Sequence, residues 1–167
     1  TPTRSSAASD VYKRQGDIIG VMDSDGQHEV KSIFEAIDLL CNDNSDLILG
    51  SRFLGKSSLN GLSQKRIKGS TLANTISKFS LPSSYKNLTD YLSGFFIFKR
   101  DSCFNFIKEI NVNGFKFLYE LLAISKGSLN IIEIPLNFNP RRSGNSKLDI
   151  AVVWDFNISI IHSLLRR

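Results

Sequence analysis

A pair of aspartates stands directly behind a short apolar run near the start of the chain. In "GVMDSDGQH", residues 20–28, Asp23 and Asp25 are two positions apart and Gln27 follows two positions later. A short apolar run is typical of a buried strand, and acids at the carboxyl end of such a strand lie where α/β sheets bind ligands. The spacing lets both carboxylates converge on one Mg²⁺ or Mn²⁺ ion, with the amide oxygen of Gln27 as a neutral donor.

Two acids at this spacing also occur for other reasons. One alternative is a turn that simply exposes its acids to solvent. A calcium loop requires a glutamate at its twelfth position, where this chain has Phe34, so that class is excluded. An aspartyl phosphatase would carry Ser or Thr soon after the strand and an acid pair downstream, and neither is evident. A site for a metal-bound diphosphate remains beside the exposed turn.

The elements that must position these acids alternate between strand and helix. The strand 17–22 precedes a helical pattern and a second apolar run at 47–49, which predicts a βαβ unit with a parallel sheet. A polar loop and a helix through residue 79 come next, followed by a strand in "SGFFIFKR", two helices, and a strand in "LNIIEIP". We expect two apolar helix faces to point inward: Val30, Ile33, Phe34, Ile37, Leu40 and Cys41 in the first helix, and Ile67, Leu72, Ala73, Ile76 and Phe79 in the second.

Composition fits one globular α/β domain or part of one. The chain has 167 residues, of which 41% are hydrophobic and 22% charged. The net charge of +5 includes +2 from residues 1–15, and this mild excess does not predict a nucleic-acid partner. Cys41 and Cys103 form no metal-binding pair and are expected to be reduced core thiols. No apolar run is long enough to span a bilayer, and no signal peptide is present.

The ends of the chain differ in pattern from its middle. Residues 1–15 are rich in Ser, Thr and Ala and show neither the helical nor the strand spacing of apolar residues. We therefore expect a non-native leader or a disordered terminus. Residues 16–148 hold the α/β pattern. Residues 149–167 form an amphipathic helical pattern that could lie on a membrane surface or pack on the sheet.

Five segments together resemble the dolichyl- or polyprenyl-phosphate mannosyltransferase type of family 2 glycosyltransferases. In chain order they are "GDIIGVMDSDGQH", "LILGSRF", "KRIKGSTLAN", "LTDYLSGFFIFKR" and "IEIPLNFNPRRSGNSKL". The resemblance implies a GT-A fold, with a central mostly parallel sheet flanked by helices, that lacks its first βαβ units. It also implies that Asp23, Asp25 and Gln27 hold Mg²⁺ or Mn²⁺ on the diphosphate of a nucleotide-sugar donor, with Asp25 as a catalytic group.

The same resemblance implies a set of phosphate-binding residues. Arg52 matches a strand-end arginine, and Arg66 and Ser70, four apart on one helix face, can both reach a phosphate. Arg141 and Lys147 match a clamp on a loop that closes over the substrates. A basic surface loop that touches anionic lipid is the alternative for these last two residues.

The segment "DYLSGF" resembles an acceptor loop. Asp90 matches its catalytic acid and Ser93 and Gly94 its turn. A lipid phosphate is already ionised near neutral pH, so it hardly needs a general base, and Asp90 is expected to orient the acceptor or the sugar.

The implied function is transfer of a hexose, mannose from GDP-mannose in the first instance, to a dolichyl or polyprenyl phosphate with inversion. The implied location is cytoplasmic and peripheral at the membrane surface. Because the nucleotide-recognising half is missing, the chain alone is expected to be an inactive carboxyl-terminal fragment. Another nucleotide sugar such as UDP-glucose, another acceptor, or a non-catalytic domain that binds anionic lipid are the alternatives.

Overall fold

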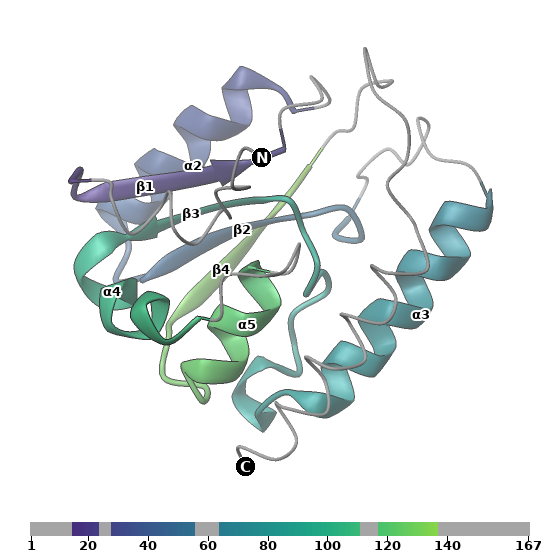
Figure 1. Ribbon diagram of the computed structural model, residues 1–167. Helices are drawn as coiled ribbons and strands as arrows, with labels where there is room; N and C mark the ends of the chain where they lie inside the picture. Colours follow the sequence, from purple (N-terminus) through teal and green to yellow (C-terminus); the bar gives the residue numbers. More distant parts are fainter. Residues whose placement is uncertain (1–14, 24–27, 56–63, 111–116, 137–167) are drawn as a thin grey trace, which may run out of the picture.

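The computed structural model describes residues 15–23, 28–55, 64–110 and 117–136, with the backbone alone for residues 64–68. Figure 1 shows a sheet with helices on both faces. The elements in chain order are β1 (Ile18–Met22), α2 (Val30–Asn42), β2 (Leu47–Ser51), α3 (Gln64–Ser80), the 3₁₀ turn η1 (Ser83–Tyr85), β3 (Phe95–Lys99), α4 (Arg100–Glu109), α5 (Phe117–Ile124) and β4 (Ile131–Pro135).

The sheet is mixed, with strand order β1-β3-β2-β4. Strand β3 runs antiparallel to both β1 and β2, and only β2 and β4 form a parallel pair. The prediction of a mostly parallel sheet was therefore wrong for the described strands, because β3 pairs with both β1 and β2 in the antiparallel sense. The helix between β1 and β2 does make them point the same way, but β3, which lies later in the sequence, inserts between them.

Strand β3 is the centre of the core because both of its faces are covered. Phe96 and Phe98 pack in a cluster with residues of α4 and α5, and the rings of Phe96 and Phe117 stack with centroids 5.6 Å apart. Phe95 and Ile97, which point to the opposite face, pack with Ala36 and Leu40 of α2 and with other buried residues. Figure 1 shows α2 on one face of the sheet and α4 and α5 on the other. This double burial fixes the register of the strand on which the site is built.

Helix α3 does not bury the face that its apolar residues predict. Leu72, Ile76 and Phe79 are 64%, 39% and 72% exposed, while Ala73, as predicted, and Ser77 face the core. The inward prediction was therefore wrong for Leu72, Ile76 and Phe79 and right for Ala73, and the side chain of Ile67 lies outside the description. The apolar residues of this helix do not form one strong stripe, so small and polar side chains decide which face packs.

Helix α2 follows its predicted pattern only in part. Leu40 is fully buried and Ile33 and Ile37 pack against the core. Val30 and Phe34 are 64% and 68% exposed. Cys103 is buried as expected, whereas Cys41 is exposed, so the prediction of two core thiols holds for one of them. The buried and exposed apolar residues lie on adjoining faces of the helix, which sequence periodicity does not separate.

Candidate active site

The strand register brings five of the predicted residues to one edge of the sheet. Met22, at the end of β1, pairs with Phe95, at the start of β3. Leu49, near the end of β2, pairs with Phe96, and Ser51 pairs with Pro135 of β4. The segments that follow β1 and β2 therefore meet the segment that precedes β3. The residues brought together are Asp23, Arg52, Asp90, Ser93 and Gly94.

Arg52 and Asp90 form a buried ion pair at this edge. The guanidinium donates from Nε to Asp90 Oδ2 and from Nη2 to Asp90 Oδ1, both at 2.7 Å. The Arg52 backbone N–H also donates to Asp90 Oδ2 at 3.1 Å. The Asp90 side chain is fully buried, and that of Arg52 is 17% exposed. A bidentate pair of this kind fixes the plane and position of the guanidinium.

The charge of this pair decides the ionisation of Arg52. Burial lowers the pKa of Arg52, but the hydrogen bond and the charge of Asp90 outweigh burial, so the pKa is raised. The charge of Asp23 adds to this rise. Arg52 is therefore a permanent cation with a fixed direction, which suits it to bind a phosphate group.

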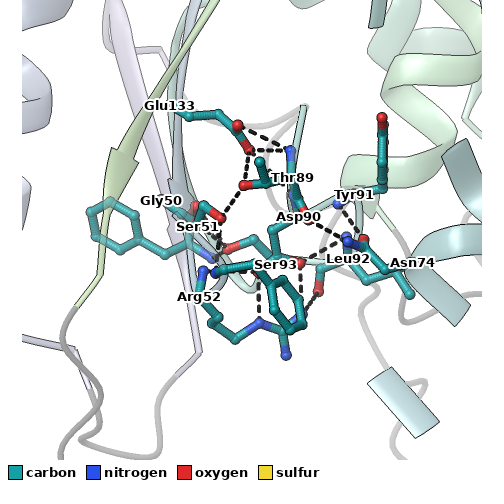
Figure 2. Close-up of polar contacts among 12 residues, drawn as sticks. Gly50, Ser51, Arg52, Asn74, Thr89, Asp90, Tyr91, Leu92, Ser93 and Glu133 are labelled. Carbon is teal, nitrogen blue, oxygen red and sulfur yellow. Dashed lines mark hydrogen bonds and ion pairs between the residues drawn. The ribbon is translucent and has the colours of Figure 1, made fainter. Parts of the chain in front are cut away.

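Asp90 is itself held by a second carboxylate, Glu133 on β4 (Figure 2). Glu133 Oε1 accepts from the backbone N–H of Thr89 at 2.9 Å and from that of Asp90 at 3.2 Å. It also accepts from the Thr89 hydroxyl at 3.1 Å. Burial raises the pKa of Glu133, the hydrogen bonds from Thr89 and Asp90 offset part of the rise, and the charge of Asp90 adds to it.

Ser93 ties the acceptor-loop segment to β2. Its hydroxyl donates to the carbonyl of Gly50 at 2.6 Å and accepts from the N–H of Phe95 at 3.1 Å. A β-carbon on Gly50 would lie 2.6 Å from side-chain atoms of Phe95 and Leu136, so the close approach requires glycine there. Ser93 is buried. Its hydroxyl therefore shapes the turn.

Asp23 and Gly94 lie against each other. The Asp23 N–H donates to the Gly94 carbonyl at 3.1 Å. A β-carbon placed on Gly94 would lie well inside 3.0 Å of the Asp23 carboxylate, so only glycine leaves room for this acid. Asp23, the first acid of the D-x-D pair, and Gly94 of the acceptor-loop segment thus pack together where β1 pairs with β3.

Helix α3 reaches the site through Asn74. Asn74 Oδ1 accepts from the Tyr91 N–H at 2.7 Å, and its amide nitrogen donates to the Thr89 carbonyl. Ser70 lies one turn earlier on the same helix and is half-buried. The backbone of Arg66 lies in α3 one turn before that, and its side chain is outside the description. Asn74 is therefore the residue through which α3 contacts the acceptor-loop segment in the described structure.

Comparison with known proteins identifies the family. The model of the family described as "Glycosyl transferase family 2" matches residues 12–104. This chain belongs to glycosyltransferase family 2. Its similar relatives include a dolichol-phosphate mannosyltransferase of Pyrococcus furiosus, 31% identical over 84% of this chain and 39% of the relative. A polyprenol monophosphomannose synthase of Mycolicibacterium smegmatis is 27% identical over 81% of this chain and 51% of the relative. The family 2 chain thus spans about half, or less, of the length of these relatives.

Solved structures with the same fold include glucosyl-3-phosphoglycerate synthase from Mycobacterium tuberculosis. Its complex with UDP gives a TM-score of 0.68 at 15% identity and covers 98% of this chain and 57% of that one. Its complex with Mn²⁺, UDP-glucose and phosphoglyceric acid gives a TM-score of 0.64 at 16% identity, over 99% of this chain and 56% of that one. The likeness establishes the α/β fold of a GT-A transferase over almost the whole of this chain, which corresponds to about 56% of the neighbour's chain.

The donor atoms that the described site offers fit a hard divalent cation. Asp23 is an exposed carboxylate at the end of β1, and carboxylate oxygen is the ligand that Mg²⁺ and Mn²⁺ prefer. Asp25 and Gln27, the other predicted ligands, lie outside the described residues. Within the described residues no group of three or more His, Cys, Asp or Glu could hold a metal ion. Arg141 and Lys147 also lie outside the described part of the chain.

Two residues of this site were missed by sequence reasoning. Glu133 is a lone acid in an otherwise apolar strand, "IIEIP", and a partly buried carboxylate must find donors. Asn74 continues the four-residue spacing of Arg66 and Ser70 by one more turn. Both signals are present in the sequence, but each is a single residue whose partners become visible only when the segments are folded together.

The region around the D-x-D pair also contains His28. Its ring lies 5.4 Å from that of Phe95, tilted by 36°, and it is half-buried. The imidazole ring of His28 therefore packs against the start of β3. None of the helices in the described part of the family 2 chain combines the length and apolar character that crossing a bilayer requires.

Proposed function

We propose that this chain is part of an inverting, metal-dependent glycosyltransferase that moves mannose from GDP-mannose to a polyprenyl phosphate. The observation that supports this most is the placement of a fixed cation, Arg52, beside the first D-x-D acid, Asp23, at one edge of a family 2 sheet. An ionised acceptor and a diphosphate leaving group both need a cation at that place. The names of the mannosyltransferase relatives support the choice of sugar and acceptor.

In the proposed reaction a phosphate oxygen of the lipid attacks the anomeric carbon of the sugar. The new carbon–oxygen bond forms on the face opposite the diphosphate, and the bond from that carbon to the diphosphate oxygen breaks. The products are the lipid-phosphate sugar with inverted configuration and a nucleoside diphosphate, and no proton has to move because the acceptor is already ionised. A divalent ion, when bound by Asp23, Asp25 and Gln27, would neutralise charge on the leaving diphosphate.

The residues of the chain would act by orientation and charge. Arg52 would bind one phosphate group, with its direction set by Asp90, and Arg66 and Ser70 would bind from the neighbouring helix. Arg141 and Lys147 would close over the substrates. Preorganised cations of this kind stabilise developing negative charge without having to reorient during the reaction. In this scheme Asp90 is a positioning residue, and Ser93 and Gly94 shape the loop that carries it.

Helix α3 offers support for a lipid acceptor. Leu72 and Phe79 expose large apolar side chains to solvent, on a helix that contains no acidic residue. Its basic residues are Lys65, Arg66, Lys68 and Lys78. An apolar surface combined with positive charge favours contact with an anionic membrane surface. Because α3 also contacts the acceptor-loop segment through Asn74, a membrane there would bring lipid phosphate near Arg52. The proposed location is therefore peripheral, at a membrane surface.

The decisive experiment is a transfer assay with the complete natural protein that contains this chain. Labelled GDP-mannose and polyprenyl phosphate in detergent should give a labelled lipid that depends on Mg²⁺ or Mn²⁺. Asp25→Asn should abolish that product, because it removes a charged ligand. Transfer by Asp25→Asn at the wild-type rate would remove the metal-site assignment. The 167-residue chain alone should show no transfer.

The same assay separates the alternatives. The structures that share the fold were solved with UDP-glucose and phosphoglyceric acid, so UDP-glucose and a soluble phosphorylated acceptor should be tested in parallel. A product only with these substrates would replace the proposed donor and acceptor. Lipid binding that ignores both chelation and nucleotide sugar, with no transfer, would favour a non-catalytic domain. Phosphate release from simple phosphomonoesters would favour a phosphatase.

A further inference from the structure

Glu133 is an acid in an otherwise apolar strand, and its carboxylate accepts several hydrogen bonds from the site. Both of its oxygens face the segment that carries Asp90: the Thr89 N–H is 2.9 Å from Oε1 and 3.0 Å from Oε2. The Thr89 hydroxyl and the Asp90 N–H complete the set on Oε1. A neutral, apolar residue on β4 would fill the same space at lower desolvation cost. We therefore attribute the carboxylate at this position to the hydrogen bonds that it accepts from Thr89 and Asp90.

A directed chain of hydrogen bonds links Glu133 to both neighbours of Arg52. The single proton of the Thr89 hydroxyl is donated to Glu133, so the Ser51 hydroxyl, 2.5 Å from Thr89 Oγ1, is the donor of that contact. Ser51 Oγ in turn accepts from the Phe53 N–H at 3.1 Å. The residues before and after Arg52 are thus tied to the same carboxylate that holds its partner. Figure 2 shows these contacts converging from three segments.

We propose that Glu133 is a positioning residue that sets the direction of Arg52, through Asp90 on one side and Ser51 on the other. This inference rests on the proposed function, because it assigns Arg52 a phosphate to meet. Glu133 makes no contact with Arg52 itself in the described structure, so its effect is transmitted by Thr89 and Asp90. Its removal would let the acceptor-loop segment shift, and Arg52 would shift with it.

Two substitutions at position 133 separate geometry from charge. Glu133→Gln keeps an oxygen where Oε1 accepts three hydrogen bonds and loses only the contact of Oε2. It should lower kcat/KM by about tenfold or less, the size expected for one hydrogen bond. Glu133→Ala removes all of these contacts and should lower kcat/KM about a hundredfold, the size expected for a misplaced binding group.

A double-mutant cycle tests whether Glu133 acts through Arg52. Arg52→Lys removes the bidentate geometry, so adding Glu133→Ala should cause little further loss if both residues belong to one unit. Tyr119→Phe is the matched control, since it removes a buried hydrogen bond to Ser80 of 2.8 Å that touches no residue of the site. It should lower the melting temperature without changing kcat/KM. Full additivity of the two losses would overturn the proposal.

A second measurement does not depend on turnover. The Arg52 Nε–H is bonded to Asp90, so its NMR signal, assigned with Arg52→Lys, should exchange slowly with water. Glu133→Ala should speed that exchange by about tenfold or more, as the loss of a hydrogen bond would. Unchanged exchange in a folded Glu133→Ala protein would refute the positioning role even if the wild type transfers sugar. Faster exchange without any transfer by the wild type would reject the proposed function alone.

Discussion

The two acidic groups at the carboxyl edge of the sheet are held in opposite ways. Asp90 is fully buried and its two oxygens accept from Arg52, whose side chain is 17% exposed. Asp23 is exposed at the end of β1, where its backbone bonds to Gly94 and its carboxylate lies over the glycine. One acid is committed to an internal cation, and the other faces the outside of the protein.

This difference separates two tasks that a diphosphate-binding site has to perform. A cation that must keep one direction needs an internal partner and a network behind it, and Arg52 has both in Asp90 and Glu133. An acid that must bind an exchangeable metal has to remain accessible. The contrast predicts that damage near Arg52 lowers stability and catalysis together, whereas damage near Asp23 also changes the metal dependence.

The largest effect should come from breaking the buried pair. Asp90→Ala leaves the Arg52 guanidinium without its carboxylate in a site from which water is largely excluded, and it should reduce the free energy of unfolding by about 3–5 kcal/mol. Urea unfolding of the complete protein measures this. Asp101→Ala is the matched control, because Asp101 is exposed and its nearest cation, Arg100, is 3.9 Å away. Equal unfolding curves for the two variants would contradict the assignment of a structural pair.

The next largest effect should come from a substitution beside Asp23. Gly94→Ala puts a methyl group where the Asp23 carboxylate lies, and we expect about 3 kcal/mol of destabilisation and a higher Mn²⁺ concentration for half-maximal transfer. Gly20→Ala, in the same strand pair, is the control, since its β-carbon would meet Ile97 at an ordinary 3.7 Å. The measurements are urea unfolding and a Mn²⁺ titration of activity. A Gly94→Ala protein with wild-type metal dependence would show that Asp23 is not a metal ligand.

A smaller effect tests whether α3 stabilises the acceptor-loop segment, which carries the partner of Arg52. Asn74→Ala leaves the Tyr91 N–H and the Thr89 carbonyl without their side-chain partner and should cost about 1–2 kcal/mol. Thr75→Ala removes an exposed hydroxyl contact within the same helix and should cost much less. Thermal unfolding compares the two. If they are equally stable, α3 does not brace the acceptor-loop segment.

The sequence predicted the meeting of these segments better than it predicted the sheet. The family resemblance grouped Arg52 and Gly94 in one site, but the strand pattern alone did not. Arg52 follows β2 and Gly94 precedes β3, and the two meet at one edge because these strands run antiparallel. The prediction of a mostly parallel sheet failed because a helical connection fixes the direction of β1 and β2 but not their adjacency. Nothing in "FFIF" says that this strand lies between them.

The parts of the site that were missed are those that depend on long-range contacts. Glu133 and Thr89 are 44 positions apart, and Asn74 and Tyr91 are 17 apart, so no local period joins them. The exposure of Leu72 follows from the same cause, since Asn74 and its partners decide how α3 is turned. An acid alone in a buried strand is a usable signal, because desolvation demands a partner, but the identity of the partner is a property of the fold.

The smallest expected effect is the pH dependence that Glu133 gives to the free energy of unfolding. Its pKa in the folded protein is raised from the ordinary value of 4.5, so between these two values the native state binds more protons than the unfolded state. The free energy of unfolding must therefore fall as pH rises through this window. Glu133→Gln cannot titrate, so the stability of the wild type relative to this variant should decline as pH rises above 4.5 and then level off. Urea unfolding at several pH values measures the difference. A difference that stays flat, or that grows with pH, would mean that the hydrogen bonds from Thr89 and Asp90 outweigh burial.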